Sequence, residues 1–118
     1  MTVNFNYYYG NSAELYSYYR IPRILLTGEA YVGLSIEAKL LYGMLMERMG
    51  MSTKNRWIDE NNRVFVIYPI SEIQEDMSVS KKKAMGYLAE LVDFGLVKKK
   101  VRGLGQPSLL YPMNFIPE

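Results

Sequence analysis

The stretch that decides the fold is MSVSKKKAMGYLAEL, residues 77–91, where three consecutive lysines follow a serine and precede an apolar run. Ser80 is suited to cap a helix, because its hydroxyl can accept a hydrogen bond from an amide of the first turn. The apolar residues that then recur at helical spacing are Ala84, Leu88, Leu91 and Val92. Gly95 stands where a C-terminal cap belongs. The pattern predicts a helix over residues 80–94, with the lysines in its first turn.

A shorter helix is expected directly before this one. Ser71 is expected to cap it, Met77 to end it, and a two-residue turn to join it to the longer helix. This order is that of a helix-turn-helix motif. Downstream, residues 96–102 and 108–113 flank a glycine-containing tip and predict a β-hairpin. We therefore predict an α+β fold, a winged helix-turn-helix with a small antiparallel sheet that forms the wing.

The first half of the chain predicts three further elements. Pro22 can begin a short helix, and Ser35 can cap the strongest helix of the sequence, which Gly50 ends. Its apolar stripe is expected to consist of Ile36, Leu40, Leu41, Met44, Leu45 and Met49. Residues 57–58 and 64–68 flank a polar turn and are rich in β-branched and aromatic side chains. They predict an additional hairpin between the first long helix and the helix-turn-helix.

An aromatic arm, residues 1–18, is expected to precede a single winged-helix domain, residues 19–118. The tyrosines of this arm are Tyr7, Tyr8, Tyr9, Tyr16 and Tyr18. They can stack on bases, or they can bury apolar area against the domain or a second subunit. Aromatic clusters at chain ends commonly tie those ends down or form interfaces. We therefore favour packing, and we expect a homodimer.

The composition excludes most catalytic chemistry. The chain has no cysteine and no histidine, so it lacks disulfides, thiolate metal sites, the commonest metal ligand and the usual general base. We expect no enzyme activity, no cofactor and no metal. The sequence also shows no signal-peptide pattern and no apolar stretch of membrane-spanning length. We expect a cytoplasmic protein that has no membrane partner.

The net charge of +2 is small, but the charges are unevenly distributed. Residues 78–118 hold seven of the 14 basic residues and only three of the 12 acidic ones. This asymmetry favours a polyanionic partner. Cations in the first turn of a helix oppose its dipole, at a cost of up to about 1 kcal/mol. The same position is a favourable anchor for a phosphate. The lysine triplet therefore has a functional interpretation beside the ordinary one of a solvated face.

The context of the triplet favours contact with double-stranded DNA, because the second helix of a helix-turn-helix enters the major groove and a second basic run lies on the hairpin. The candidate residues are Ser80, Lys81, Lys82, Lys83 and Tyr87 of the helix, and Lys98, Lys100 and Arg102 of the hairpin. Strand alternation would put Val97 and Val101 on the opposite face. This alternation does not explain Lys99, which falls between the two valines. Gly86 costs about 1 kcal/mol of helix propensity, which we attribute to packing rather than to close approach of DNA.

Three stretches carry a family resemblance: YRIPRILLTGEAYVGLSIEAKLLYGMLMERM at residues 19–49, RWIDENNRVFVIYPISEIQEDM at residues 56–77 and GLVKKKVRGLGQPSLLYPMNF at residues 95–115. Their order and spacing resemble the N-terminal domain of the plasmid replication initiator A (RepA) proteins of low-GC Gram-positive bacteria. The resemblance covers nearly the whole chain after the arm.

The resemblance implies a winged-helix domain that binds repeats at a plasmid origin, usually as a dimer, to start replication. The helix at residues 80–94 would read the DNA, and Lys98, Lys100 and Arg102 would lie along the wing. At the wing tip, where relatives often carry a basic residue, this chain has Gln106, which we include among the candidate contacts with a lower expected affinity. Family members are longer, so contacts with host replication proteins would be made through regions that lie outside this chain.

Two other functions remain open from the sequence. A winged-helix transcriptional regulator would present the same surface to a promoter operator. A winged-helix protein-interaction module would bind no nucleic acid and would show no salt-dependent affinity for duplex DNA.

Overall fold

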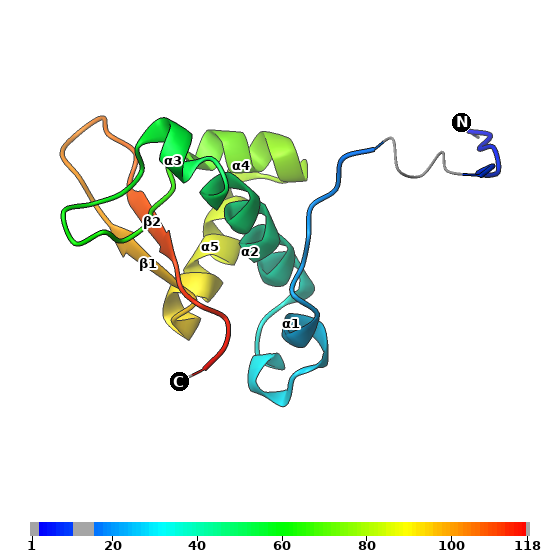
Figure 1. The fold of residues 1–118 in the computed structure, drawn as a ribbon, viewed down its shortest axis with the longest axis horizontal. Helices are drawn as coiled ribbons and strands as arrows, with labels where there is room; N and C mark the ends of the chain where they lie inside the picture. Colours follow the sequence, from blue (N-terminus) through cyan, green and yellow to red (C-terminus); the bar gives the residue numbers. More distant parts are fainter. Residues whose placement is uncertain (1–2, 11–15, 118) are drawn as a thin grey trace.

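The computed structural model describes residues 3–10 and 16–117, in which α2, α4 and α5 pack together on one side of a two-stranded sheet (Figure 1). The elements in chain order are α1 (Arg23–Thr27), the 3-10 helix η2 (Glu29–Tyr31), α2 (Ile36–Met49), α3 (Ser52–Asn55), α4 (Ile70–Met77), α5 (Lys81–Phe94), β1 (Val97–Lys100) and β2 (Leu109–Pro112). β1 and β2 are antiparallel, with Val97 opposite Pro112 and Lys100 opposite Leu109. The predicted winged helix-turn-helix is thus confirmed in its main elements. None of the described helices has the length and apolar character needed to cross a membrane.

The helix-turn-helix consists of α4 and α5, which pack against each other. Ser78 turns the chain between them in the left-handed conformation, at φ 56° and ψ 48°. Gly95 ends α5 at φ 98°, where a side chain would be strained, so its predicted role as the cap is confirmed. The predicted cap at Ser71 is wrong, because α4 already begins at Ile70 after Pro69. Pro69 precedes the helix at φ −60° and ψ 149°, and its carbonyl accepts from the amides of Glu72 and Ile73 at 3.0 and 3.1 Å.

The buried face of α2 differs in part from the predicted stripe. Ser35 caps the helix as expected, accepting a hydrogen bond from the Ala38 amide at 3.1 Å. Ile36 and Leu40, however, are 65% and 40% exposed. The buried residues of α2 include Ala38, Leu41, Tyr42, Met44 and Leu45. Tyr42 is drawn inward because its hydroxyl donates to the Met113 carbonyl near β2, and burial raises its pKa to about 12.

The additional hairpin is not confirmed as a pair of regular strands. The segment doubles back, but one isolated bridge, between Ile58 and Val64, is all that pairs its two sides. The turn is instead held by Asp59, whose carboxylate accepts from the amides of Asn61 and Arg63, each at 2.9 Å. These hydrogen bonds lower the pKa of Asp59, and the bond from the Arg63 amide has the largest effect. The following chain then joins the wing through a bridge from Val66 to Leu110 of β2.

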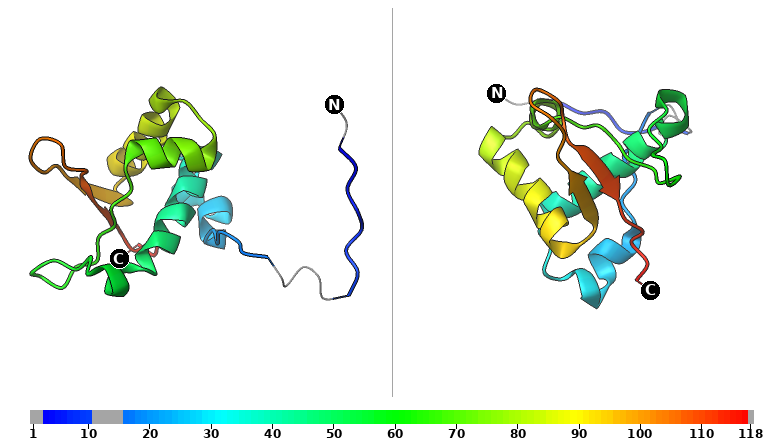
Figure 2. Two further views of the ribbon diagram at one scale, coloured as in Figure 1. Left: turned by 90° about the horizontal axis from the view of Figure 1, so that it is seen from above. Right: turned by 90° about the vertical axis from the view of Figure 1, so that its left-hand side faces the viewer.

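The N-terminal arm extends away from the domain (Figure 1, Figure 2). Residues 1–2 and 11–15 of the predicted arm lie outside the described part. Of the described arm tyrosines, Tyr7 is 85% exposed, and the rings of Tyr8 and Tyr16 meet edge to face at 6.4 Å. The described arm tyrosines are each more than half exposed, and Tyr18 lines a cleft with Gly43 and Met46 of α2, so the structure shows little of the expected packing of the arm against its own domain. Packing against a second subunit stays a prediction.

Candidate nucleic-acid interface

The N-terminus of α5 presents a concentrated positive charge. The Ser80 hydroxyl accepts a hydrogen bond from the Lys83 amide at 3.2 Å, which confirms the predicted cap. Lys81, Lys82 and Lys83 are exposed, and the first turn contains no acidic residue. The free amides of this turn, the positive end of the helix dipole and the ammonium groups all favour an anion at the same place.

α5 is held to the domain along its other side. Ala84, Leu88 and Leu91 are buried, as the sequence predicted. Glu90 also anchors the helix, because its carboxylate accepts from the Ser35 amide at 2.9 Å and from the Ser35 hydroxyl at 2.7 Å. Tyr87, a predicted DNA contact, is half-buried and packs against the hydrophobic core. Part of its ring therefore serves the fold.

The exposed side of α5 continues through Met85, Gly86 and Ala89. A Cβ atom built on Gly86 would have no described atom within 4 Å. The interpretation that Gly86 serves packing within the chain is therefore wrong. A glycine that is tolerated at the middle of an exposed helix face leaves the backbone open to close approach from outside.

The wing separates its three lysines between two faces. Cross-strand partners share a face of a sheet, and Lys99 lies opposite Leu110, which is buried in the core. Lys99 lines a cleft of about 250 Å³ together with Met85 and Leu88 of α5. This placement accounts for the lysine that the sequence pattern left unexplained. Lys99 is the wing lysine that borders α5.

Lys98 and Lys100 lie on the opposite face of the sheet. Lys98 pairs with Tyr111, whose hydroxyl donates to Asp59 at 3.1 Å. Burial and this carboxylate raise the pKa of Tyr111. Lys98 and Lys100 line a cleft of about 360 Å³ with the turn at residues 59–63, and Lys99 between them also borders this cleft. The structure therefore does not place these two predicted contacts on the side of the sheet that borders α5.

The wing tip carries the remaining predicted contacts. Arg102 is half-buried, and its Nε donates to the Pro107 carbonyl at 2.9 Å, which closes the loop. Gln106 is exposed, and its backbone amide donates to the Gly103 carbonyl at 3.1 Å. Val101, which was predicted to share the face of Val97, is 74% exposed. The regular strand ends at Lys100, and alternation no longer applies beyond it.

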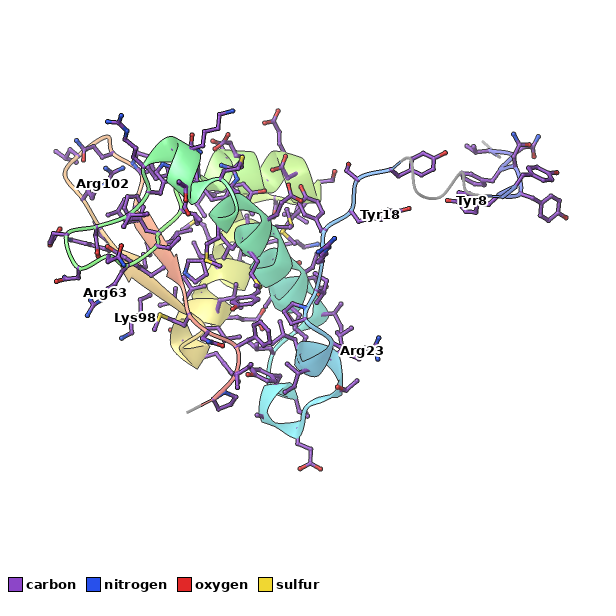
Figure 3. All side chains as sticks on the ribbon, viewed as in Figure 1. Tyr8, Tyr18, Arg23, Arg63, Lys98 and Arg102 are labelled. Atoms are coloured by element: carbon purple, nitrogen blue, oxygen red, sulfur yellow. The ribbon has the colours of Figure 1, made fainter. Side chains whose placement is uncertain are left out.

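The fold also brings forward a basic residue that sequence reasoning missed. Arg63, on the turn that Asp59 holds, lies at the same edge of the molecule as Lys98 and Arg102 (Figure 3). In the sequence Arg63 stands within an acidic, asparagine-rich stretch that gave no signal for it. The long-range bridge from Val66 to Leu110 and the hydrogen bond from Tyr111 to Asp59 set this turn beside the wing.

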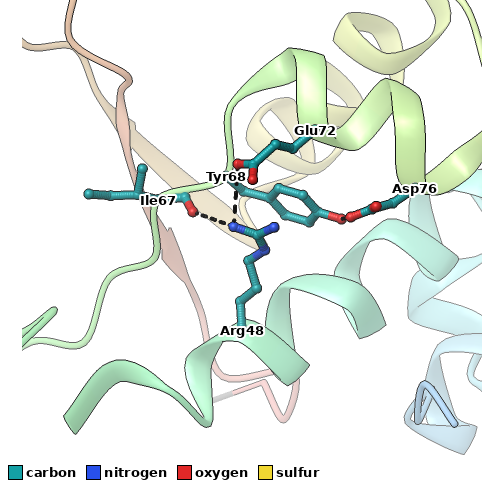
Figure 4. A network of polar contacts seen from close by, with 5 residues as sticks. All are labelled: Arg48, Ile67, Tyr68, Glu72 and Asp76. Atoms are coloured by element: carbon teal, nitrogen blue, oxygen red, sulfur yellow. Dashed lines mark hydrogen bonds and ion pairs between the residues drawn. The ribbon is translucent and has the colours of Figure 1, made fainter. Parts of the chain in front are cut away.

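Arg48 of α2 fixes the position of α4 (Figure 4). Its Nη1 donates to the Ile67 carbonyl at 2.9 Å and lies 3.6 Å from the Glu72 carboxylate. Its guanidinium stands 3.7 Å from the centre of the Tyr68 ring. The Tyr68 hydroxyl donates to Asp76 of α4, and burial, followed by this carboxylate, raises the pKa of Tyr68 well above its usual range. The acids of α4 thus position the helix-turn-helix, and the described residues contain no cluster of acids that could hold a metal.

Comparisons with known proteins agree with this architecture. The family model described as "Replication initiator protein A (RepA) N-terminus" matches residues 17–118. The "41 kDa protein" of Lactobacillus helveticus is 31% identical over 87 residues, which are 74% of this chain but 24% of that protein. The chain therefore spans about a quarter of the length of this relative.

Three solved structures share the fold. One described as "Structure of Rep-DNA complex" has a TM-score of 0.78 and 30% identity, over 96% of this chain and 87% of the other. A second, "N-Terminal domain of DNA binding protein", has a TM-score of 0.77 and 30% identity, over 98% and 88%. A third, "Structure of MDR initiator", has a TM-score of 0.72 and 26% identity, over 92% and 86%.

Proposed function

Because this chain belongs to the replication initiator protein A (RepA) N-terminus family, we propose that it is the DNA-binding domain of a plasmid replication initiator and that it recognises repeats at the plasmid origin. The family is described by initiation and not by catalysis, so we propose no enzyme activity. Its target would be plasmid DNA in the cytoplasm. Recruitment of host replication proteins is proposed for the longer protein of which such a domain forms a part.

The observation that carries this proposal is the arrangement of cations around the exposed side of α5. Lys81, Lys82 and Lys83 stand at its capped N-terminus, and Lys99 of β1 borders its flank across a cleft. A helix placed in a major groove would meet phosphates at both places, because the sugar-phosphate backbones run along both sides of the groove. The structural relative described as a Rep-DNA complex supports the same function.

An electrophoretic shift assay tests the proposal. Origin repeats of the plasmid that encodes the chain are compared with a scrambled duplex of the same composition and with the promoter of the initiator gene, at low and at moderate salt. We expect the repeats to be shifted at a lower protein concentration than either control, with an affinity that falls as salt increases. A preference for the promoter would favour a transcriptional regulator instead. Equal and salt-insensitive binding would favour a protein-interaction module.

We further propose that the domain dimerises through the aromatic arm. Phe5 and the described arm tyrosines expose large aromatic surfaces, which are common in interfaces between subunits. Sedimentation of the full chain and of a chain beginning at Tyr19 tests the idea. We expect a dimer for the full chain and a monomer for the shortened chain. An unaltered mass would contradict an interface made by the arm.

A further inference from the structure

The exposed side of α5 offers few of the groups that usually read base sequence. Bidentate hydrogen bonds to adenine come from asparagine and glutamine, and those to guanine come from arginine or lysine. The sequence of α5, KKKAMGYLAELVDF, contains such residues only as the lysines of its first turn. Glu90 already accepts two hydrogen bonds from Ser35. Beyond the first turn, Asp93 is the exposed residue of the helix that could accept a hydrogen bond from cytosine, so the rest of this face needs another way to distinguish base pairs.

An apolar cleft lies along the exposed side of α5. Met85 is 50% exposed on α5. The cleft of about 250 Å³ beside it is lined by Ile70, Met85, Leu88, Ala89, Val92, Asp93 and Lys99. Its walls are mainly apolar, whereas Lys99 on one side and the lysines of the first turn on another are suited to hold phosphates. Gly86 adds no side chain that would keep the bases at a distance.

We propose that Met85 and this cleft recognise the 5-methyl groups of thymines in the major groove. Thymine carries the one apolar group that the major groove presents, and apolar side chains distinguish it by contact. The flexible thioether of methionine adapts to such a group without a fixed hydrogen-bond geometry. The inference rests on the proposed function, because it requires α5 to lie in a major groove. It adds the chemical feature by which the domain selects its site.

The experiment begins with a pool of duplexes that have a randomised core, selected on the immobilised full chain. The dominant selected duplex is then synthesised with thymine and with uracil, which lacks the methyl group, at each thymine position in turn. We expect uracil to weaken binding about fourfold at one or two positions, because burying one methyl-sized group contributes about 0.8 kcal/mol. Met85→Ala should bind the thymine and uracil duplexes equally. Leu26→Ala, a matched loss of an exposed apolar side chain in α1, should keep the full difference.

The outcomes separate this inference from the proposed function. If selection enriches no duplex, the DNA-binding proposal fails, and the inference fails with it. If a duplex is enriched but uracil changes its affinity nowhere, DNA binding stands and methyl recognition is overturned. A Met85→Ala variant that keeps the full preference for thymine would also overturn it. A variant with unaltered DNA binding but weaker self-association in sedimentation would assign the cleft to a protein contact instead.

Discussion

The lysines of α5 and the lysines of β1 are both runs of three in the sequence, but the fold treats them differently. Successive residues of a helix are turned by about 100°, so three lysines in its first turn fan out around one end. All three are exposed beside the same free amides. Successive residues of a strand point to opposite faces. Lys99 therefore lies on the face of the sheet that borders α5, while Lys98 and Lys100 lie on the face that carries Tyr111, beside the turn at residues 59–63.

The difference shows that a charge run has no fixed meaning until its element and its neighbours are known. On α5 the three lysines form one positively charged site, because all three surround the same helix end. On β1 the cross-strand partner shows which face each lysine occupies. Lys99 shares the face of Leu110, toward the core and α5, and Lys98 shares the face of Tyr111, toward Asp59. The following predictions test this contrast.

The largest effect is expected from removing the run on α5. Changing Lys81, Lys82 and Lys83 together to alanine should weaken binding to duplex DNA. It should also flatten the plot of log affinity against log salt by about 2.7 if each lysine contacts one phosphate. Lys54→Ala, at an exposed lysine of α3, serves as the control. An unchanged slope in the triple variant would remove the α5 run from the interface.

A smaller effect is expected from the bond that anchors α5. Glu90→Ala removes the carboxylate that accepts two hydrogen bonds from Ser35, each of a kind that contributes about 1.5–3 kcal/mol. We expect the free energy of unfolding in urea to fall by at least about 1.5 kcal/mol. Arg102→Ala breaks one exposed hydrogen bond to Pro107 in the wing and should cost less. Equal losses would mean that the wing is held as firmly as α5.

The lysines of β1 should differ in their effect on DNA binding when they are changed one at a time. Lys99→Ala should weaken DNA binding and flatten the salt slope by about 0.9, because it borders α5. Lys98→Ala should change the slope less, since that side chain lies on the face of Tyr111 and Asp59. A salt titration by fluorescence anisotropy measures both. If Lys98→Ala has the larger effect, the DNA lies on the other face of the sheet.

The smallest effect is expected at Gly86, where stability and binding should change in opposite directions. Gly86→Ala meets no described neighbour and gains helix propensity, so it should stabilise the fold by about 1 kcal/mol. The added methyl group should weaken DNA binding, because it holds the helix backbone away from the bases. Thermal unfolding and anisotropy provide the two readings. An increase in both stability and affinity would contradict close approach at this position.

Local signals in the sequence were sufficient to predict features that depend on residues only a few positions apart. The cap at Ser80, the turn at Gly95 and the buried stripe of α5 were all predicted correctly. Prediction failed where a distant partner decides. Tyr42 turns inward on α2 because its hydroxyl reaches Met113, and Ile36 is left exposed. Spacing along α2 could not reveal this, since it does not contain the position of the C-terminal segment.

By itself, the sequence determined the order of the main elements, the caps at Ser35, Ser80 and Gly95 and the concentration of positive charge in the last third of the chain, because these depend on hydrogen bonds and periodicities within a few residues. The tertiary structure decided which lysines share a surface and which basic residue joins them from elsewhere. Lys99 borders α5, and Arg63 reaches the edge where Lys98 lies, through pairings with β2. Strand alternation predicts that the lysines of β1 lie on two faces of the sheet. Which face lies against α5 and which against the turn held by Asp59 depends on tertiary packing.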